Sequence, residues 1–243
     1  MVLNEIRSVI RMLILESETT TGYKMIFLAG LPGGGKSTLL KQLGIEGQFT
    51  NCNIDNFFEP ELMDALGTKN LHAFAERFFE LRDIRDERAF TKEEQEDYDR
   101  VKGLRIKEKE LFRNAINQFK QQVDEVCEIG SNFIIDGTAA NFERITEQAT
   151  NLRKGGYDCA MIFVDIDTET SVERNLARGE SGGRAIYSDI IRQQGQKLPG
   201  HLEPYRDFFG EDRFFLVPNK GTFDEYKDEI EAIRPGIEAF MGA

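Results

Sequence analysis

A glycine-rich segment near the start of the chain restricts the possible folds more than any other feature. Residues Gly30-Leu-Pro-Gly-Gly-Gly-Lys-Ser37 fit the pattern G-x-x-x-x-G-K-[ST]. The apolar run Lys24–Ala29 before it predicts a buried strand, and residues 37–43 after it predict a helix. Glycines let the backbone N–H groups of such a turn converge on phosphate oxygens, and the helix N-terminus adds positive potential. The segment therefore predicts a phosphate-binding loop, rather than a turn that is glycine-rich for structural reasons alone.

The residues of this loop predict separate roles. Lys36 would reach the β- and γ-phosphates of a nucleotide, and Ser37 would hold Mg²⁺. The residues that we expect to bind the nucleotide are Gly30, Pro32, Gly33, Gly34, Gly35, Lys36, Ser37 and Thr38.

Four further segments have the length of strands, and the last three of them are mostly apolar. They lie at residues 51–54, 132–136, 160–164 and 213–217, and helical patterns fill the segments between them. Strands that alternate with helices predict an α/β fold with a mostly parallel sheet and helices on both faces. Ligands of such sheets bind beyond the carboxyl ends of the strands, where the phosphate loop is also expected.

The chain divides into a short leading segment and one α/β domain. Residues 1–22 predict an amphipathic helix and a linker, and residues 23–243 form the domain. Within the domain, residues 59–130 are highly charged and predict a helical insertion. Thr91 and Glu94 have capping-box spacing at the start of a long periodic stretch that ends near Gly130.

Composition limits the classes of partner. The net charge is 31 − 43 = −12, which disfavours indiscriminate binding to nucleic acid or to an anionic membrane. No apolar run is long enough to span a membrane, and the first residues lack the pattern of a signal peptide. The cysteines at 52, 127 and 159 and the two histidines lack metal-ligand spacing. We expect a cytoplasmic protein with reduced thiols, no membrane contact and no specified protein partner.

Two aspartates follow predicted strands. Asp136 ends the run Phe-Ile-Ile-Asp and could hold Mg²⁺ opposite Ser37, or else cap the next helix. Asp55 follows the run at 51–54 and could accept the proton of an acceptor hydroxyl as a general base. The alternative for Asp55 is a turn-forming role in the Asp-Asn pair.

Three arginines follow the fourth predicted strand. Arg174 and Arg178 are four residues apart on a predicted helix, and Arg184 follows a glycine-containing segment. Arginines on a lid can neutralise charge that develops on a transferring phosphate, and we assign Arg178 and Arg184 to this role. The alternative is ion pairing with neighbouring acids at positions 173, 180 or 189.

The insertion contains a basic stripe. Residues 100–120 carry seven cations against two acids, and four of the cations step by 3, 4 and 4, namely Lys102, Arg105, Lys109 and Arg113. Such a stripe beside the site suits a phosphate-bearing acceptor, whereas the alternative is a solvated helix face. Thr138 and Arg174 complete the residues that we expect near the acceptor.

These segments together resemble the P-loop kinase superfamily. Residues 25–43, 51–58, 133–144 and 162–184 carry the likeness, which is nearest to polynucleotide kinases and zeta-toxin-like kinases, many of them encoded by phages or plasmids. The resemblance implies a five-stranded parallel core, ATP with Mg²⁺ as the donor, Asp55 as the base and lid arginines at 178 and 184.

The expected activity is transfer of the γ-phosphate of ATP to a hydroxyl group. A nucleic acid or nucleotide acceptor is favoured, such as a 5′-hydroxyl end or a hydroxymethylated base in DNA. Polynucleotide kinases usually carry an arginine shortly after the base, whereas residues 56–60 here contain none. The alternatives are a zeta-toxin-like kinase of a UDP-sugar and a binding module gated by slow ATP hydrolysis.

Overall fold

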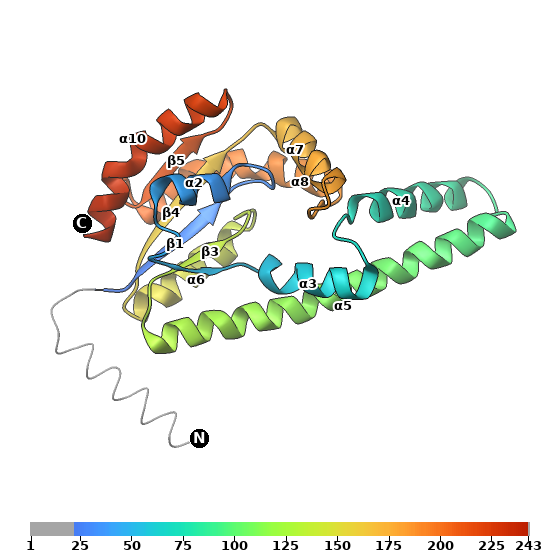
Figure 1. Cartoon of the computed structure of the whole chain (residues 1–243), viewed down its shortest axis with the longest axis horizontal. Coiled ribbons are helices and arrows are strands. Elements are labelled where there is room, and N and C mark those ends of the chain that lie inside the picture. The colour runs from blue at the N-terminus through green and yellow to red at the C-terminus, as the bar shows by residue number, and fades with distance from the viewer. Residues whose placement is uncertain (1–21, 243) are drawn as a thin grey trace, which may run out of the picture.

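A five-stranded parallel sheet forms the centre of the computed structural model, which describes residues 22–242 (Figure 1). The strands are β1 (Lys24–Ala29), β2 (Thr50–Cys52), β3 (Phe133–Asp136), β4 (Asp158–Asp165) and β5 (Phe214–Pro218), in the spatial order β2-β3-β1-β4-β5. The predicted α/β fold is therefore confirmed. The predicted N-terminal helix lies outside the described residues.

Helices cover both faces of the sheet because β1 and β4 are apolar on both sides. Outside the insertion they are α2 (Lys36–Leu43), α6 (Phe142–Lys154), α7 (Thr168–Glu180), α8 (Ser188–Lys197), α9 (Leu202–Phe209) and α10 (Phe223–Met241), with a 3₁₀ turn η1 (Leu198–His201). One core layer joins Met25 and Phe27 to α6, α9 and the end of the insertion. The other joins Ile26 and Leu28 to α2 and α10.

The insertion is helical, as predicted, and consists of α3 (Asp55–Leu66), α4 (His72–Glu87) and α5 (Lys92–Ile129). The Thr91–Glu94 capping box is present and Gly130 ends α5 in the left-handed conformation, so both predicted ends of the long helix are confirmed. The inner part of α5 packs on the sheet, whereas its outer part projects away from the core with α4 beside it (Figure 1).

The second and fourth strands differ most from their predicted bounds. The second strand ends at Cys52 rather than at residue 54, because Asn53 and Ile54 turn away from the sheet and α3 begins at Asp55. The fourth strand extends to Asp158 and Asp165 because β1 and β5 supply partners along its whole length. Among residues 22–242, no helix is both long enough and apolar enough to cross a membrane.

Candidate active site

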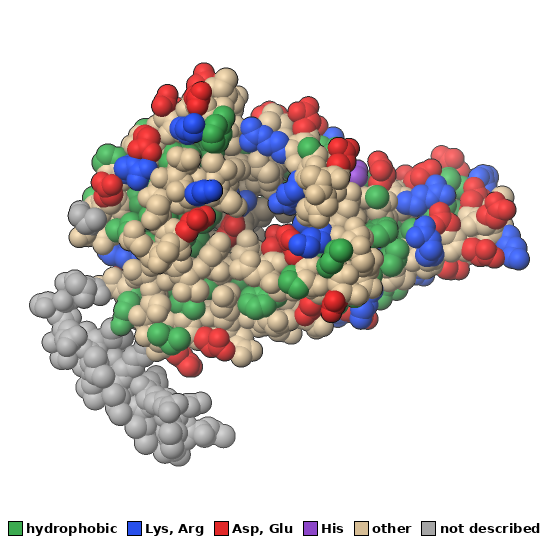
Figure 2. All heavy atoms as spheres, viewed as in Figure 1, with side chains coloured by type: hydrophobic (Ala, Val, Ile, Leu, Met, Phe, Trp, Pro, Cys, Tyr) green, Lys and Arg blue, Asp and Glu red, His purple; other side chains and the backbone are tan. Residues whose placement is uncertain are grey.

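The carboxyl ends of the strands open into one cleft of about 1220 Å³ between the core and the insertion. In Figure 2 the cleft is the hollow where the arm leaves the body of the molecule. Its wall contains the phosphate loop, Asp55, Asp136 and both lid arginines, Arg178 and Arg184. Residues that are up to about 150 positions apart in the sequence are brought together because parallel strands end at the same edge.

The phosphate loop joins β1 to α2, and contacts from outside the cleft hold its backbone. Asn219 Nδ2 donates to the carbonyl oxygen of Gly34 at 2.7 Å, and the Tyr226 hydroxyl donates to that of Gly35 at 3.0 Å. Gly35 has φ +90°, and a Cβ there would lie 2.8 Å from Asn219 Nδ2. A side chain at position 35 would therefore be strained and would also displace this support.

Sequence reasoning missed the residues that support the loop. Asn219 directly follows β5, so the rule that sites form at strand ends could have identified it. Tyr226 lies on α10, and Ser171 of α7 donates its hydroxyl to the carbonyl oxygen of Pro32 at 2.5 Å. Neither of these has a local sequence signal.

Lys36 lies over its own loop. Its Nζ donates to the carbonyl oxygens of Gly30 at 2.9 Å and Leu31 at 3.3 Å, and lies 3.9 Å from Asp136 Oδ1. Burial lowers the pKa of the Lys36 amine, and the charges of Asp136 and Asp55 oppose this shift. An anion on the loop would favour the charged amine further.

Asp136 lies at the end of β3 and accepts a hydrogen bond from Asn53 Nδ2 at 3.1 Å. Burial raises the pKa of its carboxyl, and the nearby Lys36 opposes this. A carboxylate and the Ser37 hydroxyl are the hard oxygen ligands that suit Mg²⁺, which otherwise uses phosphate oxygens and water. Within residues 22–242 no group of three or more His, Cys, Asp or Glu side chains that could hold a metal ion is present.

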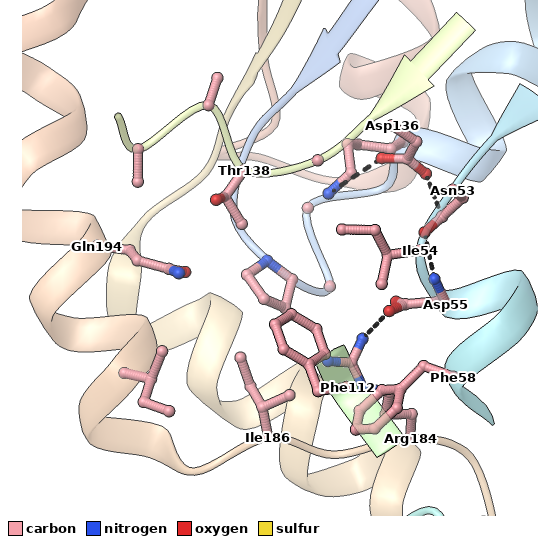
Figure 3. Close-up of a pocket in the computed structure, with 18 of the residues that line it drawn as sticks. Asn53, Ile54, Asp55, Phe58, Phe112, Asp136, Thr138, Arg184, Ile186 and Gln194 are labelled. Atoms are coloured by element: carbon pink, nitrogen blue, oxygen red, sulfur yellow. Dashed lines mark hydrogen bonds and ion pairs between the residues drawn. The ribbon is translucent and has the colours of Figure 1, made fainter. Parts of the chain in front are cut away.

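Asp55 is the first residue of α3, and its carboxylate faces the cleft (Figure 3). Its backbone N–H donates to Asn53 Oδ1 at 2.8 Å, and its Oδ1 accepts a hydrogen bond from Arg184 Nη1. The Arg184 guanidinium lies over the Phe58 ring, 5.2 Å from its centre. The predicted base and a predicted lid arginine therefore form an ion pair.

The two lid arginines also contact each other. Arg178 lies on α7, and its Nε donates to the carbonyl oxygen of Arg184. Burial lowers the pKa of the Arg178 guanidinium, and the positive charge of Arg184 lowers it further. Two neighbouring cations that face a cleft would be stabilised by an anion between them, and a phosphoryl group fits this requirement.

Arg174 does not lie where the sequence prediction put it. Its Nη1 donates to the carbonyl oxygen of Gly33 at 3.3 Å, and the residue does not line the cleft. Although Arg174 and Arg178 are four residues apart on α7, the helix passes along the phosphate loop, so the first arginine meets the outside of the loop. The assignment of Arg174 to the acceptor is therefore wrong. Thr138, in contrast, lines the cleft beyond β3 (Figure 3).

The basic stripe on α5 is divided. Arg105 lines the cleft and pairs with Glu108, whereas Lys102 lies over the Tyr98 ring, 5.8 Å from its centre. Lys109 and Arg113 line a smaller hollow of about 450 Å³, which shares Glu108 and Phe112 with the cleft. At about 100° per residue, Arg105 is turned about 60° from Lys102 around the helix axis, which directs it to the cleft. The predicted continuous stripe beside the acceptor is therefore wrong.

The segment that carries Arg184 is joined to the insertion. The Leu71 N–H donates to the carbonyl oxygen of Ala185 at 2.8 Å, and Asn70 and Ala185 form a parallel bridge. Phe79 of α4 stacks on Tyr187, with ring centres 4.9 Å apart. The segment that carries Arg184 therefore packs against α4 and the residues that precede it.

Comparisons with known proteins agree with this fold. The Zeta toxin family model matches residues 97–210. A candidate kinase from Chloroflexus aurantiacus has 18% identity over 91% of this chain and 99% of that chain, with a TM-score of 0.54. A structure from the PezAT toxin-antitoxin system of Streptococcus pneumoniae has 14% identity over 98% and 96%, with a TM-score of 0.50. No curated protein sequence matches the chain.

The predicted resemblance to the P-loop kinase superfamily and its zeta-toxin-like group is confirmed by the fold and by this family segment. The fold is kinase-like, and an origin in a phage stays a prediction.

Proposed function

Because the chain has a kinase-like P-loop fold with a zeta-toxin family segment, we propose that it transfers the γ-phosphate of ATP to a hydroxyl group of an acceptor. One observation carries the proposal: Asp55, Lys36 and two lid arginines line the same cleft. A protein that only hydrolyses ATP to switch partners has no need of an acceptor base. We therefore place the nucleotide-gated module behind the kinase.

The donor would lie on the phosphate loop. Backbone N–H groups and Lys36 would bind its β- and γ-phosphates, and Ser37 with Asp136 would hold Mg²⁺. When bound, Mg²⁺ would neutralise charge on the phosphate oxygens. Burial disfavours the charged form of Asp136, so a nearby divalent cation would compensate for this cost.

Asp55 would act on the acceptor. Its carboxylate accepts the proton of the acceptor hydroxyl while the acceptor oxygen forms a bond to the γ-phosphorus and the bond to the ADP oxygen breaks. For this step Arg184 must exchange its contact with Asp55 for one with the transferring phosphoryl group. Arg178 and Arg184 then neutralise the charge on the equatorial oxygens.

The observations favour a small acceptor over a nucleic acid strand. Three cations of the basic stripe, Lys102, Lys109 and Arg113, do not line the cleft, and Arg105 is already paired. The row of cations that a nucleic acid backbone would follow is therefore interrupted at the entrance to the site. The zeta toxin family match also supports the alternative of a sugar nucleotide.

The identity of the acceptor can be tested with ATP labelled in the γ-phosphate. The panel should contain 5′-hydroxyl oligonucleotides, DNA with hydroxymethylated bases, nucleosides, UDP-sugars and sugar phosphates. We expect label on a small hydroxyl compound. Label released only to water with every acceptor would contradict the kinase proposal.

Asp55→Asn tests the base. We expect turnover to fall about 10²-fold or more with ATP affinity unchanged, because the base acts in the chemical step. Asp64→Asn on the exposed face of α3 is the matched control and should behave as wild type. Steady-state kinetics and ATP titrations provide both values. Loss of ATP binding with normal turnover at saturation would assign Asp55 to the donor instead.

A further inference from the structure

The cations that line the cleft fall into two groups. Five are engaged: Lys36 by loop carbonyl groups, Lys69 by Glu59, Arg105 by Glu108, Arg184 by Asp55 and Arg178 by the Arg184 carbonyl oxygen. The other two, Arg144 and Lys197, line the same cleft and make no side-chain hydrogen bond or ion pair with any residue between 22 and 242. The free positive charge of the cleft is therefore on α6 and α8.

The free amide groups of the cleft are on the same two helices. Gln148 lies one turn after Arg144 on α6, and Gln193 lies one turn before Lys197 on α8. The neighbouring Gln194 points into the cavity near Thr138 (Figure 3), and its Oε1 is buried without a hydrogen-bond partner in the described part of the chain. A buried polar atom without a partner is costly, so a ligand or water that bonds to it would be stabilising.

Apolar side chains of α6 and α8 line the same part of the cleft wall. Ile145 of α6 and Ile190 of α8 line the cleft between the polar residues. A surface with apolar patches and a few convergent polar groups is typical of a small-molecule site. Arg144 and Lys197 are themselves solvent-exposed, so both can contact an anion that enters the cleft.

Contacts outside the cleft hold this part of its wall in place. The Tyr205 hydroxyl donates to the carbonyl oxygen of Ala139 at 2.8 Å, and this holds a loop in which Ala139 has φ +54°. On the outer side of α8, Arg192 binds Glu169 through two hydrogen bonds of 3.0 Å. Because the backbone is held by these contacts, the polar groups of the wall can be oriented before a ligand binds.

We infer that Arg144 and Lys197, with Gln148 and Gln194, form an anion-binding subsite in the acceptor half of the cleft. The inference rests on the proposed kinase function. The acceptor would be a small polyol or nucleoside that bears a phosphate group. Its phosphate would lie between α6 and α8, its hydroxyl groups would bond to the glutamines, and its reacting hydroxyl would face Asp55. A cleft of about 1220 Å³ has room for such a molecule beside a nucleotide, since one drug-sized ligand needs about 300–1,000 Å³.

Equilibrium binding tests the subsite without any need for phosphate transfer. The donor site is first saturated with Mg²⁺ and a non-hydrolysable ATP analogue. Calorimetry then compares matched probes that differ only by a phosphate: ribose with ribose 5-phosphate, glucose with glucose 1-phosphate, and uridine with uridine 5′-monophosphate. We expect the wild type to bind at least one phosphorylated probe about tenfold or more tightly than its neutral partner, because charge-assisted hydrogen bonds are stronger than neutral ones.

The double variant Arg144→Gln, Lys197→Gln should lose this preference. Lys154→Gln is the matched control, since it removes an exposed cation from α6 outside the cleft, and it should keep the preference. An unchanged affinity for the ATP analogue in each variant verifies that the fold is intact. The inference is overturned if no phosphorylated probe is preferred by the wild type, or if the double variant keeps the preference.

The two proposals can fail separately. A phosphate preference that the double variant loses, together with label that reaches only water, would retain the subsite and reject the kinase. Label transfer to an acceptor whose KM is the same in wild type and double variant would retain the kinase and reject the subsite.

Discussion

Arg184 contacts both the proposed base and the other lid arginine. It binds Asp55, lies over Phe58 and has a buried Nε without a partner within the described residues. Its backbone carbonyl also accepts a hydrogen bond from Arg178. A single change at this position therefore affects both the base and the charge on the transferring phosphate.

We predict that Arg184→Ala lowers turnover by about 10²-fold, because a preorganised cation is removed from the transition state. Arg184→Lys should recover only part of the activity, since an ammonium lacks the planar fork of a guanidinium. ATP affinity should change little. Steady-state kinetics of both variants at saturating ATP provide the test, and wild-type turnover in both would reject the lid assignment.

The predicted site residues that follow a strand lie together in the cleft. Lys36, Asp55 and Asp136 could be placed because parallel strands bring their carboxyl ends together. Asn219 obeys the same rule but stands outside any motif, and Tyr226 contacts the loop only because α10 packs back on the sheet. Arg174 was misplaced because helical spacing does not show which way a helix passes the loop.

Contacts between whole elements join the lid to the insertion. Phe79 on α4 stacks on Tyr187 at the start of α8, and the Asn70–Ala185 bridge lies close to Arg184 in the chain. The position of α4 therefore influences where the lid arginine lies.

We predict that Phe79→Ala lowers turnover several-fold, because α4 no longer holds the lid. Phe90→Ala is the control, since Phe90 packs on Tyr98 in the outer part of the insertion, away from the lid. Both variants lose the same phenyl ring, so the test compares the turnover number of Phe79→Ala with that of Phe90→Ala. Equal turnover in the two variants would show that the lid is positioned without α4.

The start of α5 should respond to pH. A hydrogen bond from Arg88 lowers the pKa of the Glu94 carboxyl to about 2, and the backbone N–H of Thr91 contributes. The folded-state pKa is thus below the ordinary value of 4.5, so the charged group stabilises the fold above pH 4.5 and this contribution is lost as pH falls toward 2.

Glu94→Gln removes this charge while keeping an acceptor for the cap. We predict a lower melting temperature than wild type at pH 7, and a difference that shrinks progressively as pH is lowered below about 4.5. Thermal unfolding followed by circular dichroism at several pH values provides the measurement. A difference independent of pH would mean that packing, and not charge, stabilises this end.

Element ends with a local signal were predictable, whereas contacts between elements were not. The capping box at Thr91 and the glycine at 130 gave the limits of α5. The stripe on α5 was misread because helical periodicity shows which residues share a face but not what covers that face. Here α4 covers the outer half of the helix and α3 part of the inner half, and Arg105 alone turns to the cleft.

The molecule as a whole has a net charge of −12, whereas seven cations and a few acids line its cleft. The acidic surface disfavours anions in general, and the fixed cations of the cleft restrict anion binding to one place. The carboxyl ends of β1, β2 and β3, the lid and the insertion all contribute to that cleft. The whole arrangement is consistent with a donor nucleotide and a second anionic ligand bound side by side.

Transfer of labelled γ-phosphate by wild type and by Lys36→Ala is the most direct test of the central claim. Lys41→Ala, an exposed lysine on the same helix α2, is the matched control. We predict label on an acceptor hydroxyl with wild type and with Lys41→Ala, and only background with a Lys36→Ala variant whose circular dichroism is unchanged. A folded Lys36→Ala variant with near wild-type transfer would contradict the account.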